Sequence, residues 1–129
     1  MALSSRIYLD TNILLDVLER RPRFEKVAQV LQKYSIYSSS VVAIATSFYI
    51  AQKEIGLRVS DLKRLTSDFI ILNNGAAELS KAYEICADED LEDAIQVATA
   101  IIGGADTFLT ADKKLLKNYG HLIDVVCIE

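Results

Sequence analysis

The sequence contains one histidine, one proline, two cysteines and no tryptophan among its 129 residues. A single histidine, His121, argues against a histidine-based zinc site and against a Ser–His–Asp triad. The two cysteines, Cys86 and Cys127, lie in apolar segments without CxxC spacing, which predicts buried reduced thiols. Any chemistry in this chain is therefore expected to rely on carboxylates.

Long hydrophobic runs are also missing. The longest candidate, residues 41–51, falls short of the roughly 18 residues that a membrane span needs and is interrupted by Thr46 and Ser47. The first ten residues, MALSSRIYLD, lack the basic start and the long apolar stretch of a signal peptide. We therefore expect a cytoplasmic protein that makes no use of a membrane.

Basic residues do not dominate the charge, which is −4 overall with a pI near 5.0. This balance disfavours a protein that coats nucleic acid by bulk electrostatics, but it allows an enzyme that meets phosphates through a bound cation. Basic side chains do cluster locally, around residues 20–23 and 113–117. Most such clusters are solvated surface; the candidates for weak substrate contacts are Arg20, Arg21, Lys113 and Lys114.

Apolar residues make up 51% of the chain, which is ample for the core of a single domain spanning residues 1–129. Short apolar strands are predicted at 6–10, 35–39, 69–73, 106–111 and 124–129. Helical patterns lie between them, at 12–19, 24–34, 40–56, 60–68, 76–88, 90–105 and 112–118. This alternation predicts a three-layer α/β/α sandwich with a mostly parallel sheet of about five strands.

Acidic residues stand where such a fold places its sites, outside the carboxyl ends of the strands. Asp10 ends the first strand, and Asp112 follows the strand at 106–111. Asp90 and Asp93 lie in the first turn of one helix, three residues apart and on one face. Helix capping can account for Asp10, Asp90 and Asp112. It explains Asp93 poorly, because Asp93 lies inside its helix, near the apolar face.

Several carboxylates in one cleft repel each other unless a cation neutralises them. Oxygen ligands suit Mg²⁺ or Mn²⁺, which keep some of their waters and bind substrate phosphates. The acids therefore indicate hydrolysis of a phosphate ester by water that a metal ion activates.

Two segments, YLDTNILLDVL near the start and DLEDAIQVATAIIGGADTFLTAD near the end, resemble the PIN-domain family, in the same order and over nearly the whole chain. The resemblance implies an Mg²⁺- or Mn²⁺-dependent ribonuclease, and small VapC-like members are often the toxin of a toxin–antitoxin pair. It also implies RNA as the substrate and an antitoxin protein that covers the acidic cleft. A homodimer is a further expectation, through the apolar faces of the early helices with Leu15, Leu18 and Phe24, although core packing is the commoner fate of such faces.

The same resemblance assigns roles to residues. Asp10 matches the first acid of the family, Asp93 the third, with Asp90 as a supporting acid, and Asp112 the fourth. The three main acids are then both catalytic and metal-binding. The hydroxyl beside the fourth acid is Thr110, and the polar residues that support the first acid are Thr11 and Asn12.

One position departs from the family pattern. Six residues after Ser40 the family usually has a glutamate, and here Thr46 stands there. Glu54 lies about two helical turns further on, roughly 12 Å along the axis, too far to substitute. Tyr49 is similar to the tyrosine of a PIN subgroup that lacks this glutamate. A hydroxyl at position 46 can bind the water of a metal ion, but one carboxylate fewer weakens metal binding.

Three functions remain open at this stage. The first is the metal-dependent endoribonuclease, with Asp10, Asp93 and Asp112 on one ion. The second is a PIN-fold module with weak or no catalysis that acts by binding protein or RNA, which the missing glutamate favours. The third is a different phosphoryl-transfer enzyme; Asn12, where an aspartate phosphatase has its second acid, and the lack of a glycine-rich phosphate loop argue against it.

Overall fold

A computed structural model describes residues 5–129 of the chain. The expectation that no signal peptide is present falls partly on residues 1–4, outside the described residues. The strands are β1 (Arg6–Leu9), β2 (Ile36–Ser40), β3 (Ile70–Leu72), β4 (Thr107–Thr110) and β5 (Asp124–Cys127). The helices are α1 (Thr11–Leu18), α2 (Phe24–Leu31), α3 (Val41–Ile55), α4 (Val59–Leu65), α5 (Ala76–Ile85), α6 (Leu91–Ile102) and α7 (Lys113–Tyr119).

The five strands form one parallel sheet in the order β3-β2-β1-β4-β5. The chain winds outward in both directions from β1, so that β1 lies at the centre and its carboxyl end beside that of β4. Tyr8 of β1 is in register with Ser38 of β2 and Phe108 of β4. All five strands end at the same edge, as the sequence predicted.

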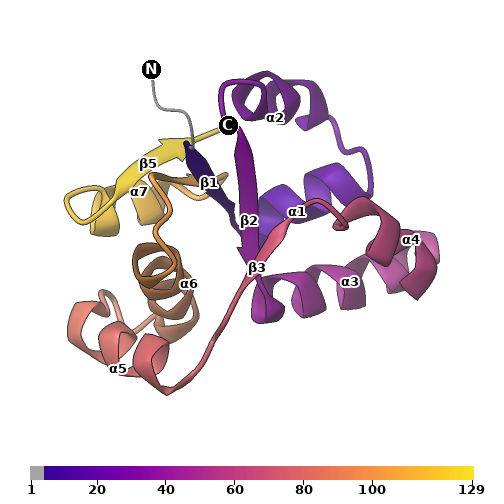
Figure 1. Ribbon diagram of the computed structural model, residues 1–129. Helices are drawn as coiled ribbons and strands as arrows, with labels where there is room; N and C mark the ends of the chain where they lie inside the picture. Colours follow the sequence, from indigo (N-terminus) through magenta and orange to yellow (C-terminus); the bar gives the residue numbers. More distant parts are fainter. Residues whose placement is uncertain (1–4) are drawn as a thin grey trace.

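Alternate residues of the strands feed two separate cores. Tyr8 and Phe108 stack with ring centroids 5.0 Å apart, on the face that α5, α6 and α7 cover. Ile7, Leu9 and Leu109 point to the other face, against α1, α2 and α3. Figure 1 shows α5–α7 on the left of the sheet and α1–α4 on the right. The predicted three-layer α/β/α sandwich is therefore confirmed.

The apolar face with Leu15 and Leu18 packs into the core, the commoner fate of such faces, whereas the expected burial of the two cysteines was wrong. Leu15 and Leu18 are 5% and 7% exposed, because they pack with α3 and α4 in a third small core. They are therefore not available to form a dimer surface. Both cysteines are partly exposed free thiols rather than buried ones.

The start of one helix and the burial of one strand also differ from the sequence prediction. The helix α4 begins at Val59 with Arg58 as its N-cap, because the carboxylate of Asp61 accepts the Arg58 backbone N–H at 3.1 Å. The sequence had placed Ser60 at that start. In β3, Ile70 and Ile71 are 38% and 44% exposed, so this edge strand is less covered than the sequence predicted. Within residues 5–129, no helix is long and apolar enough to cross a membrane.

Candidate active site

Asp10 lies at the centre of the carboxyl edge, directly after β1. It is the N-cap of α1, and its Oδ1 accepts the backbone N–H of Thr11 at 2.7 Å. Its own backbone N–H donates to the carbonyl of Leu109 in β4 at 3.0 Å. The residue is only 4% exposed. The carboxylate is thus fixed in position and nearly removed from water, which costs free energy unless something compensates its charge.

The end of β4 contributes a second set of polar groups. Thr110 Oγ1 donates to Asp10 Oδ2 at 2.7 Å and accepts the backbone N–H of Asp112 at 3.0 Å. Asp112 caps α7 by accepting the backbone N–H of Lys114 at 2.9 Å. Asn12 Oδ1 accepts the backbone N–H of Ala111 at 3.2 Å. One hydroxyl therefore links Asp10 to the segment that carries Asp112.

The start of α6 brings the third acid. Asp90 is the N-cap, and its Oδ1 accepts the backbone N–H of Asp93 at 3.2 Å. One turn after Asp93, the side-chain amide of Gln96 donates to Thr11 Oγ1 at 2.9 Å. Asp93 and Gln96 share a helix face because they are three residues apart. The amide contact therefore anchors the half-buried Asp93 carboxylate beside the start of α1.

Burial dominates the protonation of Asp10. Desolvation raises its pKa from 3.8 to about 6, against the hydrogen bonds from Thr110 and Thr11, which lower it. The negative charges of Glu92 and Asp112 raise it further. The groups that act on Asp10 come from α6, from the end of β4 and from the start of α7. These elements therefore meet the end of β1 at one acidic region.

The pKa of Asp93 is raised still more, from 3.8 to about 7. Desolvation is the largest cause, followed by the charge of Asp90 and a hydrogen bond with it, and then by the charges of Asp10 and Asp112. Within residues 5–129, none of the ion pairs involves any of these acids. The region is thus an acidic site without a basic partner, which a cation would stabilise.

The donor set is oxygen only, as Mg²⁺ and Mn²⁺ prefer. No group of three or more His, Cys, Asp or Glu residues within the described part of the chain is arranged to hold a metal ion directly. Mg²⁺, however, commonly binds through one or two carboxylates and fills its remaining positions with water. Asp10 and Asp93 are two carboxylates with a raised pKa, and Asp112 acts on both of them. This set fits an ion that is held by two carboxylates and by water.

The helix α3 does not add a carboxylate to the site. Thr46 is half-buried, and no hydrogen bond within residues 5–129 joins it to the three acids. Glu54 pairs with Arg21 at 3.3 Å, so it is engaged elsewhere. Tyr49 is 58% exposed, with the ammonium of Lys53 4.3 Å from its ring centroid.

The basic candidates divide into two groups. Arg21 is bound to Glu19 and Glu54, and the guanidinium of Arg20 lies over the ring of Phe24 at 4.9 Å. No contact of the described residues brings either arginine to the acids. Lys113 and Lys114, in contrast, are exposed in the first turn of α7, directly after Asp112.

Sequence reasoning missed a buried polar chain beneath the acids. The hydroxyl of Tyr8 donates to Gln96 Oε1 at 2.9 Å and lies 2.8 Å from Ser40 Oγ. Together with the contact between Gln96 and Thr11, this chain joins β1, β2, α6 and α1. The available signal was Gln96 itself, a long polar residue among the apolar residues of α6 and one turn from Asp93. Glu92 was also missed as a charge that acts on Asp10.

Comparisons with known proteins identify the family and the fold. The model of the PIN domain family matches residues 7–122. No curated protein sequence matches the chain.

Solved structures share the fold at low identity. VapBC2 from Rickettsia felis, bound to a DNA fragment from its promoter, has a TM-score of 0.71 and 19% identity, covering 96% of this chain and 99% of that one. A toxin–antitoxin complex from Klebsiella pneumoniae has a TM-score of 0.68 and 23% identity, covering 93% and 95%. VapC20 from Mycobacterium tuberculosis, a toxin that cleaves the sarcin–ricin loop, has a TM-score of 0.65 and 16% identity, covering 79% and 86%. With the family model matched over most of its length, the chain belongs to the PIN domain family.

Proposed function

We propose that this protein is a divalent-metal-dependent endoribonuclease and the toxin of a toxin–antitoxin pair. PIN-family proteins are generally ribonucleases that use divalent metal ions. The observation that carries the proposal is the buried Asp10, held by Thr11 and Thr110, whose pKa is raised first by desolvation and then by the charges of Glu92 and Asp112. Such an arrangement costs stability in the free protein, and a bound cation would recover that cost.

Each residue has a distinct task in this proposal. Asp10 and Asp93 would hold the ion, and Asp112 would reach it through one of its waters. The ion, when bound, activates water and offsets negative charge on the scissile phosphodiester. Thr110 keeps Asp10 oriented, and Asn12 fixes the backbone of Ala111 just before Asp112.

The partners follow from the same family. Solved relatives include complexes of a toxin with its antitoxin, two of them bound to DNA fragments. For this chain we propose a small antitoxin that covers the acidic cleft and brings a basic side chain to it, because the acids lack such a partner among residues 5–129. The proposal includes a homodimer in the cytoplasm. Leu15 and Leu18 are not part of the dimer interface, because they are buried in the core.

The direct test is cleavage of single-stranded RNA oligonucleotides with Mn²⁺, with Mg²⁺ and with EDTA. We expect cleavage by the wild type with either ion, no cleavage in EDTA, and a loss of at least about 100-fold in Asp10→Asn and Asp93→Asn. Asp68→Asn, which changes an exposed carboxylate in the turn before β3, is the matched control and should cleave normally. Cleavage that persists in both active-site variants would reject the assignment.

Thr46 favours a second candidate, a PIN-fold module that binds RNA or protein with weak or no catalysis. It stands where the family has a carboxylate, and nothing on α3 replaces that charge. Titration calorimetry with Mn²⁺ separates the two functions. Binding that Asp10→Asn abolishes supports the nuclease, whereas no binding up to millimolar metal, together with retained RNA binding, supports the module.

A further inference from the structure

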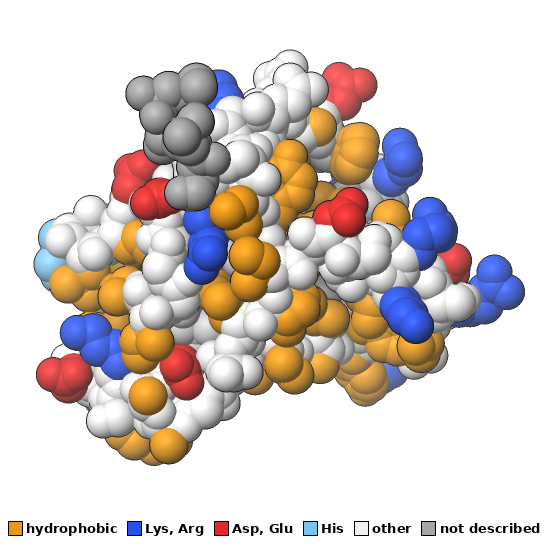
Figure 2. Space-filling view, in the orientation of Figure 1, with side chains coloured by type: hydrophobic (Ala, Val, Ile, Leu, Met, Phe, Trp, Pro, Cys, Tyr) orange, Lys and Arg blue, Asp and Glu red, His pale blue; other side chains and the backbone are white. Residues whose placement is uncertain are grey.

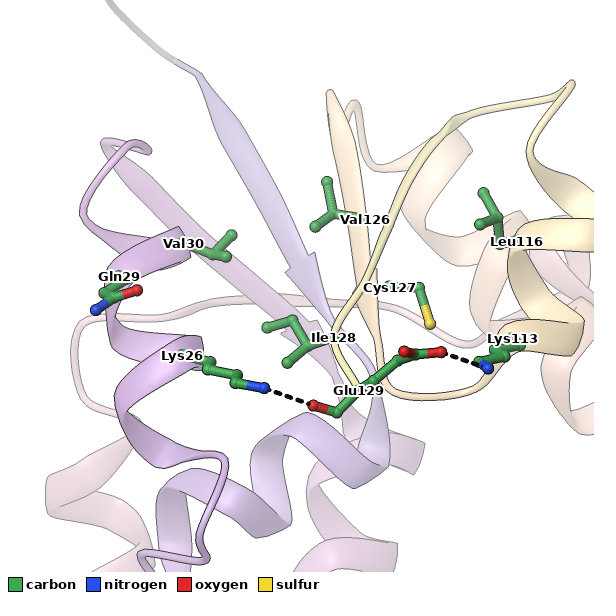
Figure 3. Close-up of a pocket in the computed structure, with 9 residues that line it drawn as sticks. All are labelled: Lys26, Gln29, Val30, Lys113, Leu116, Val126, Cys127, Ile128 and Glu129. Carbon is green, nitrogen blue, oxygen red and sulfur yellow. Dashed lines mark hydrogen bonds and ion pairs between the residues drawn. The ribbon is translucent and has the colours of Figure 1, made fainter.

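A cavity of about 640 Å³ lies between α2, the end of β5 and the start of α7. Figure 3 shows two lysines at its rim, one from α2 and one from α7, with apolar side chains behind them. The volume is in the range of small-ligand sites. The lining residues that matter here are Lys26, Gln29, Lys113, Leu116, Val126 and Ile128.

The two lysines meet at one acidic residue. Lys26 Nζ donates to the main-chain oxygen of Glu129 at 3.1 Å, and Lys113 Nζ lies 2.5 Å from Glu129 Oε1. Both dashed contacts are drawn in Figure 3. The side chains of Lys113 and Glu129 are 77% and 65% exposed, so this ion pair contributes little to stability. Two ammonium groups therefore converge on one set of oxygen acceptors that a stronger anion can displace.

This cavity adjoins the acidic site. Cys127 at the end of β5 is the register partner of Thr110, and the backbone N–H of Ile128 donates to the carbonyl of Thr110 at 2.8 Å. Thr110 is the residue that holds Asp10, and Lys113 directly follows Asp112. A strand of nucleic acid at the acids therefore meets Lys113 first, and Lys26 contacts the same residue, Glu129, as Lys113 does.

The acids create the need for such a contact. A phosphodiester strand is repelled by Asp10, Asp93 and Asp112 on either side of the one phosphate that a bound cation serves. Proteins that bind single strands combine cationic side chains along the backbone with surfaces on which bases rest. The cavity supplies the cationic groups at its rim, and the half-buried Val126 and the exposed amide of Gln29 lie beside them.

We propose that this cavity binds the nucleotide next to the scissile phosphodiester, with Lys26 and Lys113 on its phosphate. The inference rests on the proposed function, since it takes RNA as the substrate. Glu129 occupies the phosphate position in the free protein and leaves it when RNA binds. The side chain of Glu129 is thus a competitor, and its removal strengthens RNA binding.

The test is the affinity of a fluorescein-labelled single-stranded RNA, measured by anisotropy in EDTA on an Asp10→Asn background that cannot cleave it. Lys26→Gln and Lys113→Gln should each weaken binding about threefold to tenfold at 50 mM salt and reduce the salt slope by about 0.7. Glu129→Gln should tighten binding by a similar factor. In the otherwise wild-type enzyme, each lysine variant should raise KM and leave kcat within about twofold.

Lys63→Gln is the matched control, because it removes the same charge from α4. That helix leads into β3, at the opposite edge of the sheet from β5, and Figure 2 shows basic side chains gathered around it on the right. Equal weakening by Lys63→Gln would overturn the site in favour of unspecific charge. A hexaglutamate peptide that binds with the same dependence on both lysines, while RNA does not, would assign the cavity to an acidic protein segment and overturn it too.

The experiment separates this site from the proposed function. Normal RNA binding and cleavage by both lysine variants would overturn the proposed nucleotide site and leave the nuclease proposal intact. A wild-type protein that does not cleave RNA, yet binds it through both lysines, would reject the nuclease and support the cavity. If the Asp10→Asn protein does not bind RNA, the proposed nucleotide site is overturned.

Discussion

Thr110 Oγ1 donates a 2.7 Å hydrogen bond to Asp10 Oδ2 across 100 residues of sequence. Both side chains are buried, and they extend from the ends of the two strands at the centre of the sheet. This bond favours the ionised form of Asp10, whereas its burial and the neighbouring acids favour the neutral form. The protein thus holds a costly carboxylate in place with one hydroxyl and one backbone N–H.

Replacing that hydroxyl provides the first prediction. Thr110→Val keeps the shape of the side chain but leaves Asp10 Oδ2 without its donor and the backbone N–H of Asp112 without its acceptor. We expect a loss of about 2 kcal/mol in the free energy of unfolding at pH 8, measured by urea denaturation. The loss should be smaller at pH 5, where Asp10 is mostly protonated, and small at both pH values in Thr110→Ser. An equal loss at both pH values would mean that the bond to Asp10 contributes nothing and that the loss comes from the backbone N–H of Asp112.

The raised pKa of Asp10 gives a second prediction, for stability against pH. The pKa is about 6 in the folded chain and near 3.8 in the unfolded chain, so the folded state binds more protons between these values. The free energy of unfolding therefore falls as the pH rises through this window. Asp10→Asn should remove a penalty of about 3 kcal/mol at pH 8 and almost none at pH 4.

The measurement is urea denaturation in EDTA at both pH values. Asp68→Asn is the control, and it should shift stability little at either pH. Mn²⁺ should stabilise the wild type at pH 8, since an ion that binds only the folded state raises its stability by mass action, and should leave Asp10→Asn unchanged. A destabilised Asp10→Asn at pH 8 would contradict the proposed charge penalty.

Local chemistry made much of the site predictable. Asp10, Asp90 and Asp112 were expected as helix N-caps at strand or loop ends, and all three accept backbone N–H groups there. Capping depends only on residues within a turn, so the sequence displays it directly. The parallel sheet then placed the ends of β1 and β4 side by side without any knowledge of side-chain contacts.

Contacts between distant segments were not predictable in this way. The bond from Gln96 to Thr11 joins residues 85 positions apart, and the burial of Leu15 and Leu18 depends on where α3 and α4 pack. The start of α4 was misplaced because a carboxylate at Asp61 competes with the hydroxyl of Ser60 for the capping role. Each miss reflects tertiary packing or a competing local partner that periodicity does not reveal.

An ion pair with one fully buried partner gives a third prediction. Arg23 binds Asp16 through two hydrogen bonds, of 2.9 and 3.1 Å, and the Asp16 side chain is fully buried. Arg23→Met leaves that carboxylate without its partner and should cost about 3–5 kcal/mol.

Urea denaturation of four proteins tests this pair, namely the wild type, Arg23→Met, Asp16→Asn and the double variant. The double variant should recover part of the loss, which gives a coupling energy well above that of a surface pair. Arg64→Met is the control, because its pair with Asp61 spans 3.6 Å and its side chain is 72% exposed, so we expect less than about 1 kcal/mol. Additive losses in the cycle would contradict a coupled pair.

The fourth prediction concerns Thr46, at the position where the resemblance to the family usually places a glutamate. Thr46→Glu adds a negative charge on the half-buried face of α3. If the site is short of one acid, this charge should raise Mn²⁺ affinity about tenfold in titration calorimetry and increase cleavage at low metal. Thr46→Gln has nearly the same size without the charge and should bind Mn²⁺ as the wild type does. An equal effect of both variants would mean that altered packing, and not the added charge, changes the affinity. An unchanged affinity in Thr46→Glu would mean that α3 does not reach the ion.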